Sequence, residues 1–433
     1  MISMNTLTLP GYQISASISE GLNTSVYRGI RESDEQPVII KILKAEFPTL
    51  EEITRLKNEY KITQHLHVES IVKSYSIETY QNRFALILED FGGQSLSKII
   101  SKRLNLTAFL NIGIQLTSAL NSLHQNCIIH KDIKPSNIII NVETETVKIN
   151  DFSVASRLSK ENPQINSANL VEGTVAYMSP EQTGRMNRTL DYRSDFYSLG
   201  VTFYEMLTGE LPFNSTDILE LVHCHIAKHP VPPCKCRRNA ENRDEIPQVV
   251  SDIVMKLLAK NAEDRYQTAE GIKADLEKCL NSLQTTGEIV DFVPGQWDRS
   301  GQLSIPQKLY GREAEVDRLL AAFERVSGIE EQPQPENAEN LAACSQSEIV
   351  LVSGYSGIGK TAIVNEVHKP IVRQRGYFIK GKFDQFKRNI PYAALIQAFQ
   401  SLIGQLLTES AENFQAWREK LAAALGANGA VIA

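Results

Sequence analysis

The stretch HKDIKPSN, residues 130–137, constrains this chain more than any other part of its sequence. It follows an apolar-striped helix predicted at 106–124 and precedes a short β-branched run, so it forms a loop. Such a loop can direct several polar side chains at one point. Asp132 could accept the proton of an attacking hydroxyl, Lys134 could neutralise a transferring phosphoryl group, and Asn137 offers an amide oxygen to magnesium.

Two other segments supply charged groups that suit the same chemistry. In KINDFS, Asp151 ends a short predicted strand 19 residues after Asp132, and its carboxylate is a second candidate magnesium ligand. Lys41 lies in the β-branched run VIIKIL, where alternation would bury it, so it needs an anionic partner. Phosphate oxygens would serve, and Glu59 on the predicted helix 50–66 is the natural carboxylate partner.

An N-terminal segment, SEGLNTSV, has the rhythm of a phosphate-covering loop between two strands. Such a loop normally carries three glycines as G-x-G-x-x-G-x-V. Counting back from Val26, these positions hold Ser19, Gly21 and Thr24. Taken alone, the stretch therefore favours an ordinary β-hairpin, and only the rest of the chain can favour a nucleotide loop.

Composition narrows the class of protein. A length of 433 residues allows two to three domains, and 42% hydrophobic with 22% charged residues is typical of a globular protein. A net charge of -6 gives no basic face for nucleic acid, and six cysteines in so long a chain are no disulfide framework. No apolar run approaches the ~20 residues of a membrane helix, and the N-terminus lacks a signal-peptide pattern. We expect a cytoplasmic protein with reduced thiols.

Taken in order, these segments resemble the eukaryotic-type protein kinase family. The family motifs H-R-D-L-K-P-x-N, D-F-G and V-A-I-K read HKDIKPSN, DFS and VIIK here. GTVAYMSPEQ resembles the end of the activation segment, and SDFYSLGVTFYEMLTGELPF resembles the segment after it. The resemblance implies that Asp195 braces the catalytic loop and that Arg265 pairs with Glu181. It covers about 11–281 and implies an α+β fold with a β-rich N-lobe and an α-rich C-lobe.

The resemblance also implies an activity, its cofactors and its site residues. The chain would transfer the γ-phosphoryl group of ATP, with Mg²⁺, to protein hydroxyls, and DIKPSN with Thr174 matches the serine/threonine-specific pattern. The implied catalytic residues are Asp132, Lys134, Asn137, Lys41 and Glu59. The implied kinase metal ligands are Asn137 and Asp151, and the other nucleotide contacts are Ile18, Gly21, Val26, Glu89 and Phe91.

Departures from the family pattern leave alternatives open. Ser19 and Thr24 would be strained at positive φ, which predicts weaker ATP binding. Ser153 replaces the glycine of D-F-G and would stiffen that turn, and Lys131 replaces an arginine, which puts regulation by loop phosphorylation in doubt. One alternative is therefore a pseudokinase that acts as a binding scaffold.

A second candidate phosphate site is GYSGIGKT, which follows the apolar run EIVLVSG, predicted to be a buried strand, and precedes a predicted helix. Backbone N–H groups there would cradle phosphate, Lys360 would reach the β and γ phosphates, and Thr361 would hold magnesium. The nucleotide-binding residues predicted here are Gly354, Gly357, Gly359, Lys360 and Thr361. We therefore expect a linker at 282–305, then part of an AAA-type P-loop NTPase at 306–433 with a mobile insertion near 327–346.

Hydrolysis by such a domain needs a second acidic motif, an apolar strand that ends in aspartate. The only aspartate after Lys360 is Asp384, in GKFDQF, and no apolar run precedes it. The NTPase part therefore reads either as truncated or as a binding element. Another alternative follows, in which the working unit is an NTPase switch regulated by the kinase region.

The whole layout is similar to large bacterial signalling proteins, common in cyanobacteria. These join a serine/threonine kinase to an AAA-type predicted ATPase, sensor domains and a C-terminal histidine kinase. The resemblance implies that a sensor and histidine kinase region follows residue 433 and acts as a partner, alongside ATP and a protein substrate. No nucleic-acid or membrane partner is expected.

Overall fold

The computed structural model of this protein describes most of the kinase-like region and part of the C-terminal region. The residues that it describes are 9–66, 68–80, 82–100, 104–157, 175–183, 189–236, 246–299, 311–327, 347–355, 358–365, 377–383, 392–406 and 411–425. Thr174, Gly357 and nearly all of the predicted insertion lie outside these residues.

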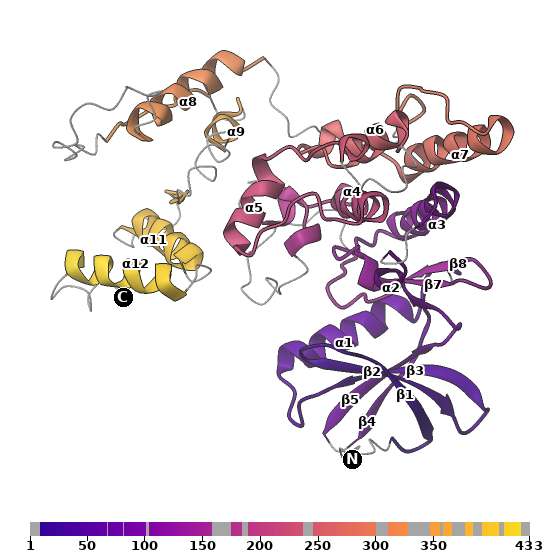
Figure 1. The fold of residues 1–433 in the computed structure, drawn as a ribbon. Helices are drawn as coiled ribbons and strands as arrows, with labels where there is room; N and C mark the ends of the chain where they lie inside the picture. Colours follow the sequence, from indigo (N-terminus) through magenta and orange to yellow (C-terminus); the bar gives the residue numbers. More distant parts are fainter. Residues whose placement is uncertain are drawn as a thin grey trace.

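The N-terminal lobe is an antiparallel sheet of five strands in the order β1-β2-β3-β5-β4. One helix, α1 (Leu50–Thr63), lies beside the sheet (Figure 1). Thr49 and Glu52 form a reciprocal capping box at the start of α1, which satisfies backbone N–H groups there. The strands are β1 (Tyr12–Glu20), β2 (Thr24–Arg31), β3 (Gln36–Leu43), β4 (Ser74–Tyr80) and β5 (Arg83–Glu89).

Strand alternation divides this sheet into two faces. Val38 and Ile40 of β3 pack in one apolar cluster, whereas Leu43 packs with Leu56 of α1 in another. Because successive side chains on a strand point to opposite faces, Lys41 lies on the same face as Leu43, toward α1. The alternation of residues along β3 therefore fixes the face of the sheet on which the Lys41 side chain lies.

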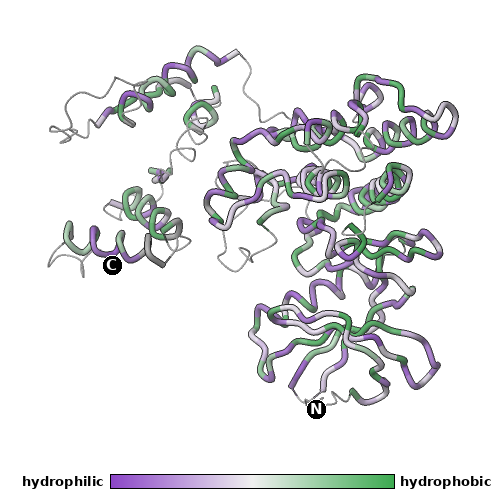
Figure 2. The backbone as a smooth tube through the Cα atoms, viewed as in Figure 1, coloured by the Kyte–Doolittle hydropathy of each residue, from purple (hydrophilic) through white to green (hydrophobic). Residues whose placement is uncertain are grey.

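The C-terminal lobe is mostly helical and packs around one large apolar core. Figure 2 shows hydrophobic residues running along α3, which contacts α7, α4 and β8. A small sheet of order β6-β7-β8 joins the lobes near the predicted catalytic loop. The helices and strands of the C-terminal lobe are β6 (Gln94–Ser95), α2 (Leu96–Ile100), α3 (Leu106–Gln125), β7 (Ile138–Asn141), β8 (Thr146–Ile149), α4 (Arg193–Thr208), α5 (Ile218–Ala227), α6 (Gln248–Leu257) and α7 (Ala269–Thr286).

The predicted fold class is confirmed, since a β-rich lobe is followed by a helical one. The predicted linker differs from the structure in its first part. Helix α7 continues to Thr286, and the segment 288–299 then folds back onto the C-lobe, where Phe292 packs against the core and Asp298 accepts hydrogen bonds from Gln267 and Thr268. The polar composition of 282–305 suggested a linker, and composition does not show that Asp298 has hydrogen-bond partners about 30 residues away in sequence.

The C-terminal region is described as four helices. They are α8 (Glu313–Ser327), α9 (Lys360–Asn365), α11 (Ala393–Leu406) and α12 (Ala411–Leu425). The buried strand predicted before Gly354 is not formed, and Ile349 and Leu351 are 96% and 89% exposed. A buried strand needs neighbouring strands to satisfy its backbone hydrogen bonds. The segment 347–353 pairs with no other strand among the residues that the structure describes.

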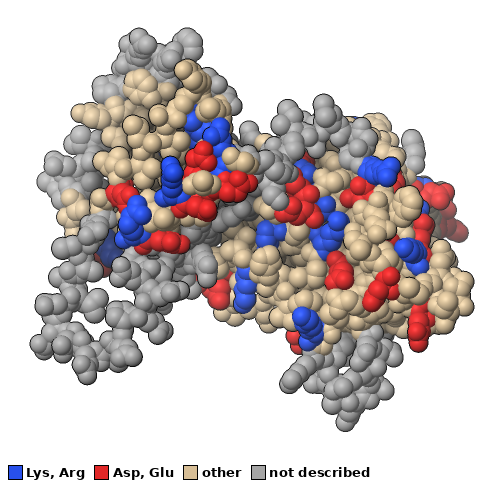
Figure 3. Space-filling view, turned by 90° about the horizontal axis from the view of Figure 1, so that it is seen from above, with Lys and Arg blue, Asp and Glu red and all other residues tan. Residues whose placement is uncertain are grey.

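Acidic and basic side chains are interspersed on the face seen in Figure 3. Among the residues that are described, no helix combines the length and the hydropathy that crossing a membrane requires.

Candidate active site

Lys41 lies at the centre of an ion-pair cluster between the sheet, α1 and the segment after β8, in which Glu59 is buried and Asp151 is 30% exposed. Its Nζ lies 2.7 Å from Oε2 of Glu59 and 3.1 Å from Oδ1 of Asp151. The three groups come from β3, α1 and the chain just beyond β8. The structure therefore forms the predicted Lys41–Glu59 pair and adds to it Asp151, which the sequence suggested only as a magnesium ligand.

Burial and mutual charge set the protonation of this cluster. Burial alone would lower the pKa of Lys41, but the Asp151 and Glu59 carboxylates outweigh it and hold the pKa above its usual value. Burial raises the pKa of Glu59 to about 7, with a further rise from Asp151 that Lys41 only partly offsets. Burial would also raise the pKa of Asp151, but Lys41 lowers it, so Asp151 is the firmly ionised carboxylate.

The predicted catalytic loop gathers its three polar side chains around Asp132. Oδ2 of Asp132 lies 2.8 Å from Nζ of Lys134 and accepts a 2.8 Å hydrogen bond from Nδ2 of Asn137. Nδ2 of Asn137 also donates to the Asp132 carbonyl at 2.9 Å, while its Oδ1 accepts a long hydrogen bond of 3.4 Å from the Ser136 hydroxyl. Oδ1 of Asp132 is buried and has no hydrogen-bond partner among the described residues.

Asp195, in the first turn of α4, holds the backbone of the predicted catalytic loop through hydrogen bonds. Its Oδ2 accepts from the His130 N–H at 3.0 Å, and its Oδ1 accepts from the Lys131 N–H at 2.8 Å. Nε2 of His124 also contacts Oδ2 at 3.0 Å. Asp195 thus fixes two successive peptide groups just before Asp132.

The DFS turn is fixed between the catalytic loop and α1. Phe152 is buried, with its ring edge-on to His130 at 4.7 Å between centroids. Nδ2 of Asn58 donates to the Ala155 carbonyl at 3.0 Å, which ties α1 to the residues after the turn. The left-handed residue of the turn is Asp151, at φ 66°, and Ser153 is not left-handed. Glycine is therefore not required at position 153 in this conformation.

The segment SEGLNTSV, residues 19–26, is a glycine-poor loop that forms a tight hairpin between β1 and β2. Gly21 donates its N–H to the Thr24 carbonyl at 2.8 Å, and Ser19 pairs with Val26. Neither Ser19 nor Thr24 has a positive φ, so the prediction of backbone strain at these two positions is wrong for this conformation. The physical reason is that both lie in extended strand backbone, which any residue adopts. Ile18, on β1, is partly buried beside this hairpin.

The segment between the lobes carries an ion pair that the sequence interpretation missed. Nζ of Lys148 on β8 lies 2.7 and 2.9 Å from the two carboxylate oxygens of Glu89, and 4.9 Å from the centre of the Phe91 ring. Lys148 is buried on a short strand, so the argument that gave Lys41 an anionic partner would have predicted one for Lys148 too, but not that the partner is Glu89. The carboxylate of Glu89, predicted near the nucleotide, is thus occupied by Lys148.

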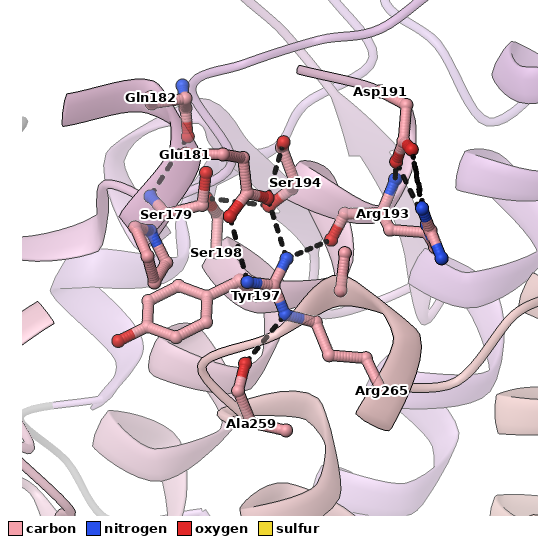
Figure 4. Close-up of polar contacts among 12 residues, drawn as sticks. Ser179, Glu181, Gln182, Asp191, Arg193, Ser194, Tyr197, Ser198, Ala259 and Arg265 are labelled. Atoms are coloured by element: carbon pink, nitrogen blue, oxygen red, sulfur yellow. Dashed lines mark hydrogen bonds and ion pairs between the residues drawn. The ribbon is translucent and has the colours of Figure 1, made fainter. Parts of the chain in front are cut away.

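Glu181 and Arg265 form the buried ion pair that the sequence interpretation expected. Figure 4 shows the two side chains facing each other. Two guanidinium nitrogens of Arg265 donate to the two carboxylate oxygens of Glu181, at 2.7 and 2.9 Å. Ser194 donates to the same carboxylate, and Arg265 also donates to the Ala259 carbonyl. Burial would raise the pKa of Glu181, but Arg265 outweighs it and lowers the pKa to about 2. This pair joins the end of the activation segment to the C-lobe.

The described residues of the second candidate phosphate site are 354–355 and 358–361, and the last two of them begin α9. Gly354 and Gly359 have φ values of 157° and 93°, and Nζ of Lys360 donates to the carbonyls of Gly354 and Tyr355, both at 2.7 Å. Thr361 follows in the first turn of α9. Among the described residues, two glycines of this motif thus have positive φ, but the predicted buried strand before it is not formed.

Comparison with known proteins matches both regions. The protein kinase domain family matches residues 12–276, and the AAA ATPase domain family matches residues 339–432. The chain is 31% identical over 415 residues to hybrid signal transduction histidine kinase G of Dictyostelium discoideum, covering 76% of this chain and 11% of that protein. It is 35% identical over 278 residues to a probable serine/threonine-protein kinase of Clostridium perfringens, covering 64% and 39%.

A further relative is a serine/threonine-protein kinase of Myxococcus xanthus, 29% identical over 374 residues, which cover 80% of this chain and 66% of the relative. The protein kinase match covers more than half of the chain and coincides with the two-lobed fold, so the chain belongs to the protein kinase family. Its kinase domain is joined to an AAA-type ATPase domain, as predicted. The chain spans only a ninth of the first relative and about two fifths of the second.

Proposed function

We propose that the kinase domain transfers the γ-phosphoryl group of ATP to serine or threonine hydroxyls of proteins. The matched family and the named specificity of the Clostridium and Myxococcus relatives support this class of substrate. The proposed catalytic residues are Lys41, Glu59, Asp132, Lys134 and Asn137, which lie in two hydrogen-bonded groups in the structure.

One observation carries the proposal: Asp132 keeps one buried carboxylate oxygen free while its other oxygen is held. Lys134 and Asn137 fix Oδ2, so Oδ1 has a defined direction and, among the described residues, no hydrogen-bond partner. Leaving a buried carboxylate oxygen unpaired is unfavourable, and an incoming hydroxyl would satisfy it. Asp132 would then orient that hydroxyl and accept its proton as the new bond to phosphorus forms.

The residues present also fit ATP and Mg²⁺. Asn137 and the ionised Asp151 offer amide and carboxylate oxygens, the donor type that magnesium prefers. When bound, the metal would neutralise phosphate charge. Lys41 would hold the α and β phosphates, with Glu59 fixing its position, and Ile18, Gly21, Val26, Glu89 and Phe91 would surround the rest of the nucleotide.

The test is phosphoryl transfer from labelled ATP with magnesium, to the protein itself and to a generic basic protein. Wild type is compared with Asp132→Asn, which keeps the shape of the side chain but removes the proton acceptor. Asp291→Asn, an exposed residue far along the chain, is the matched control. We expect the Asp132 variant to lose at least about 10²-fold in rate, the usual contribution of a general base.

The outcomes separate the kinase from its alternatives. Label from wild type that persists undiminished in Asp132→Asn would refute the assigned mechanism. No label from wild type with ATP binding intact would favour the binding scaffold. No ATP binding would mean that the glycine-poor hairpin excludes nucleotide.

A second candidate function is nucleotide binding by the AAA domain. It is favoured by the two glycines of extreme φ and by Lys360, whose amine already faces the loop carbonyls. Lys360→Ala should abolish nucleotide binding that survives in Lys41→Ala, measured with a fluorescent ATP analogue. Unchanged binding in Lys360→Ala on that background would exclude this site. Transfer activity that depends on Lys360 would support regulation between the two domains.

A further inference from the structure

The peptide group between Lys131 and Asp132 has an unusual conformation and decides where the Asp132 side chain begins. Lys131 is left-handed, at φ 68°, which is rare for a residue with a side chain. The N–H of this peptide, on Asp132, donates to Nδ1 of His130 at 3.2 Å. Such a conformation persists only when its surroundings hold it in place.

The carbonyl of the same peptide is held by Gln182, from the 3-10 turn Pro180–Thr183. Nε2 of Gln182 donates to the Lys131 carbonyl at 2.8 Å. Its Oε1 accepts the Ser179 N–H at 3.0 Å, the contact drawn in Figure 4. The amide is therefore bound at both ends, which fixes its orientation.

We propose that Gln182 is a positioning residue for Asp132. It holds the carbonyl side of the Lys131–Asp132 peptide while His130 holds the N–H side, and so it sets the direction in which Asp132 presents its free oxygen. The conformation of the catalytic loop then depends on that of residues 175–183, because the Oε1 end of the Gln182 amide is held by the Ser179 N–H. The inference rests on the proposed kinase function for its catalytic readout.

The chain contains a glutamine of the same chemistry that serves as a matched control. Gln115 on α3 donates through Nε2 to the carbonyl of Glu145 at 2.8 Å and accepts the Val147 N–H at 3.0 Å. Glu145 is also left-handed, at φ 53°. Both glutamines are partly buried, so Gln115→Glu removes an equivalent bond from the β7–β8 turn instead of the catalytic loop.

The discriminating variant is Gln182→Glu in the full chain. Its carboxylate can still accept the Ser179 N–H but presents an oxygen, not a donor, to the Lys131 carbonyl. We expect kcat to fall about tenfold to a hundredfold, the range for a misplaced catalytic group, with KM for ATP within about twofold. Gln115→Glu should leave kcat within about twofold of wild type.

A pH profile distinguishes positioning from a general loss of structure. When the introduced carboxyl is protonated it can again donate to the Lys131 carbonyl. An ordinary glutamate becomes protonated only as the pH approaches about 4.3. The ratio of kcat in Gln182→Glu to kcat in wild type should therefore rise as the pH is lowered from 7 to 5. Gln182→Met, which fills the space without either polar group, should lose a similar kcat but show no such rise.

Hydrogen exchange supplies a readout that does not depend on activity. The amide of Asp132 should exchange faster in both Gln182 variants than in wild type or Gln115→Glu, while circular dichroism stays unchanged. The inference is overturned if the exchange of this amide matches wild type, or if kcat stays within about twofold in both Gln182 variants. It is also overturned if only KM for the protein substrate rises, since Gln182 would then shape the substrate site. Absence of transfer in wild type refutes the proposed function, and exchange alone then decides the role of Gln182.

Discussion

The segment 288–299 should contribute measurably to the stability of the kinase domain, chiefly through Asp298. Oδ2 of Asp298 accepts the Gln267 N–H at 2.6 Å, and Oδ1 accepts the N–H and the hydroxyl of Thr268 at 2.9 and 2.7 Å. Thr268 is the N-cap of α7, so the carboxylate also lies at the positive end of that helix. Gly271 has no room for a side chain because Asp298 lies against it.

The magnitude follows from these contacts. Hydrogen bonds to a charged group contribute about 1.5–3 kcal/mol each, and three on one carboxylate are not additive. Water replaces part of the loss once the segment lifts away, so we expect Asp298→Ala to lower the free energy of unfolding by about 2–4 kcal/mol. Asp298→Asn keeps an acceptor without the charge and should lose about half as much.

The assay uses the position of the neighbouring tryptophan. The chain has two tryptophans, so Trp417→Phe leaves Trp297 as the only reporter, one residue from Asp298. Urea unfolding followed by circular dichroism gives the stability, and the fluorescence anisotropy of Trp297 in the absence of urea reports whether the segment is docked. Asp291→Ala, an exposed aspartate of the same segment, is the control. If Asp298→Ala matches that control within about 0.5 kcal/mol, with unchanged anisotropy, the segment is a free linker and this reasoning fails.

Three further predictions concern buried groups of the C-lobe and the active site. Glu181→Ala should destabilise the domain by about 3–5 kcal/mol in urea unfolding, because Arg265 would stay buried without its carboxylate; a loss below about 1 kcal/mol would contradict this. Ser179→Ala should be neutral or stabilising by up to about 1 kcal/mol, because the Ser179 hydroxyl is buried and unpaired among the described residues, and a clear loss in Tm would reveal a missed partner. Since burial raises the pKa of Glu59 from 4.5 to about 7, the folded state binds more protons than the unfolded state between these values, and stability should fall as pH rises through that window. Glu59→Gln should remove this fall, about 3 kcal/mol for a pKa raised from 4.5 to about 7, and equal slopes in both proteins would show that Glu59 ionises normally.

Much of the kinase domain could be predicted from local pattern. The β-branched run around Lys41 gave β3, the apolar stripe at 106–124 gave α3, and the polar loop between α3 and β7 gave the three side chains around Asp132. These predictions succeed because strand and helix periods, and the pairing of a buried charge, are properties of short stretches of chain.

The errors have equally physical causes. Strain was expected at Ser19 and Thr24 because the family pattern has glycine there, yet both lie in extended strands. The run EIVLVSG was predicted as a buried strand from its apolar side chains, but a strand also needs partners, and the described residues supply none. Both cases turn on backbone conformation, which residue type alone does not decide.

By itself, the sequence predicted the order of the lobes, the ionisable groups that meet in the candidate active site, and a second, phosphate-loop domain. Each of these is written in contiguous motifs whose chemistry can be read directly. Only the tertiary structure decided that Lys148 neutralises Glu89, that Gln182 holds the Lys131 carbonyl, and that Asp298 attaches the segment 288–299 to the start of α7. These contacts join residues 30 to 59 positions apart through single polar groups, and no local period or composition records which distant atom such a group will meet.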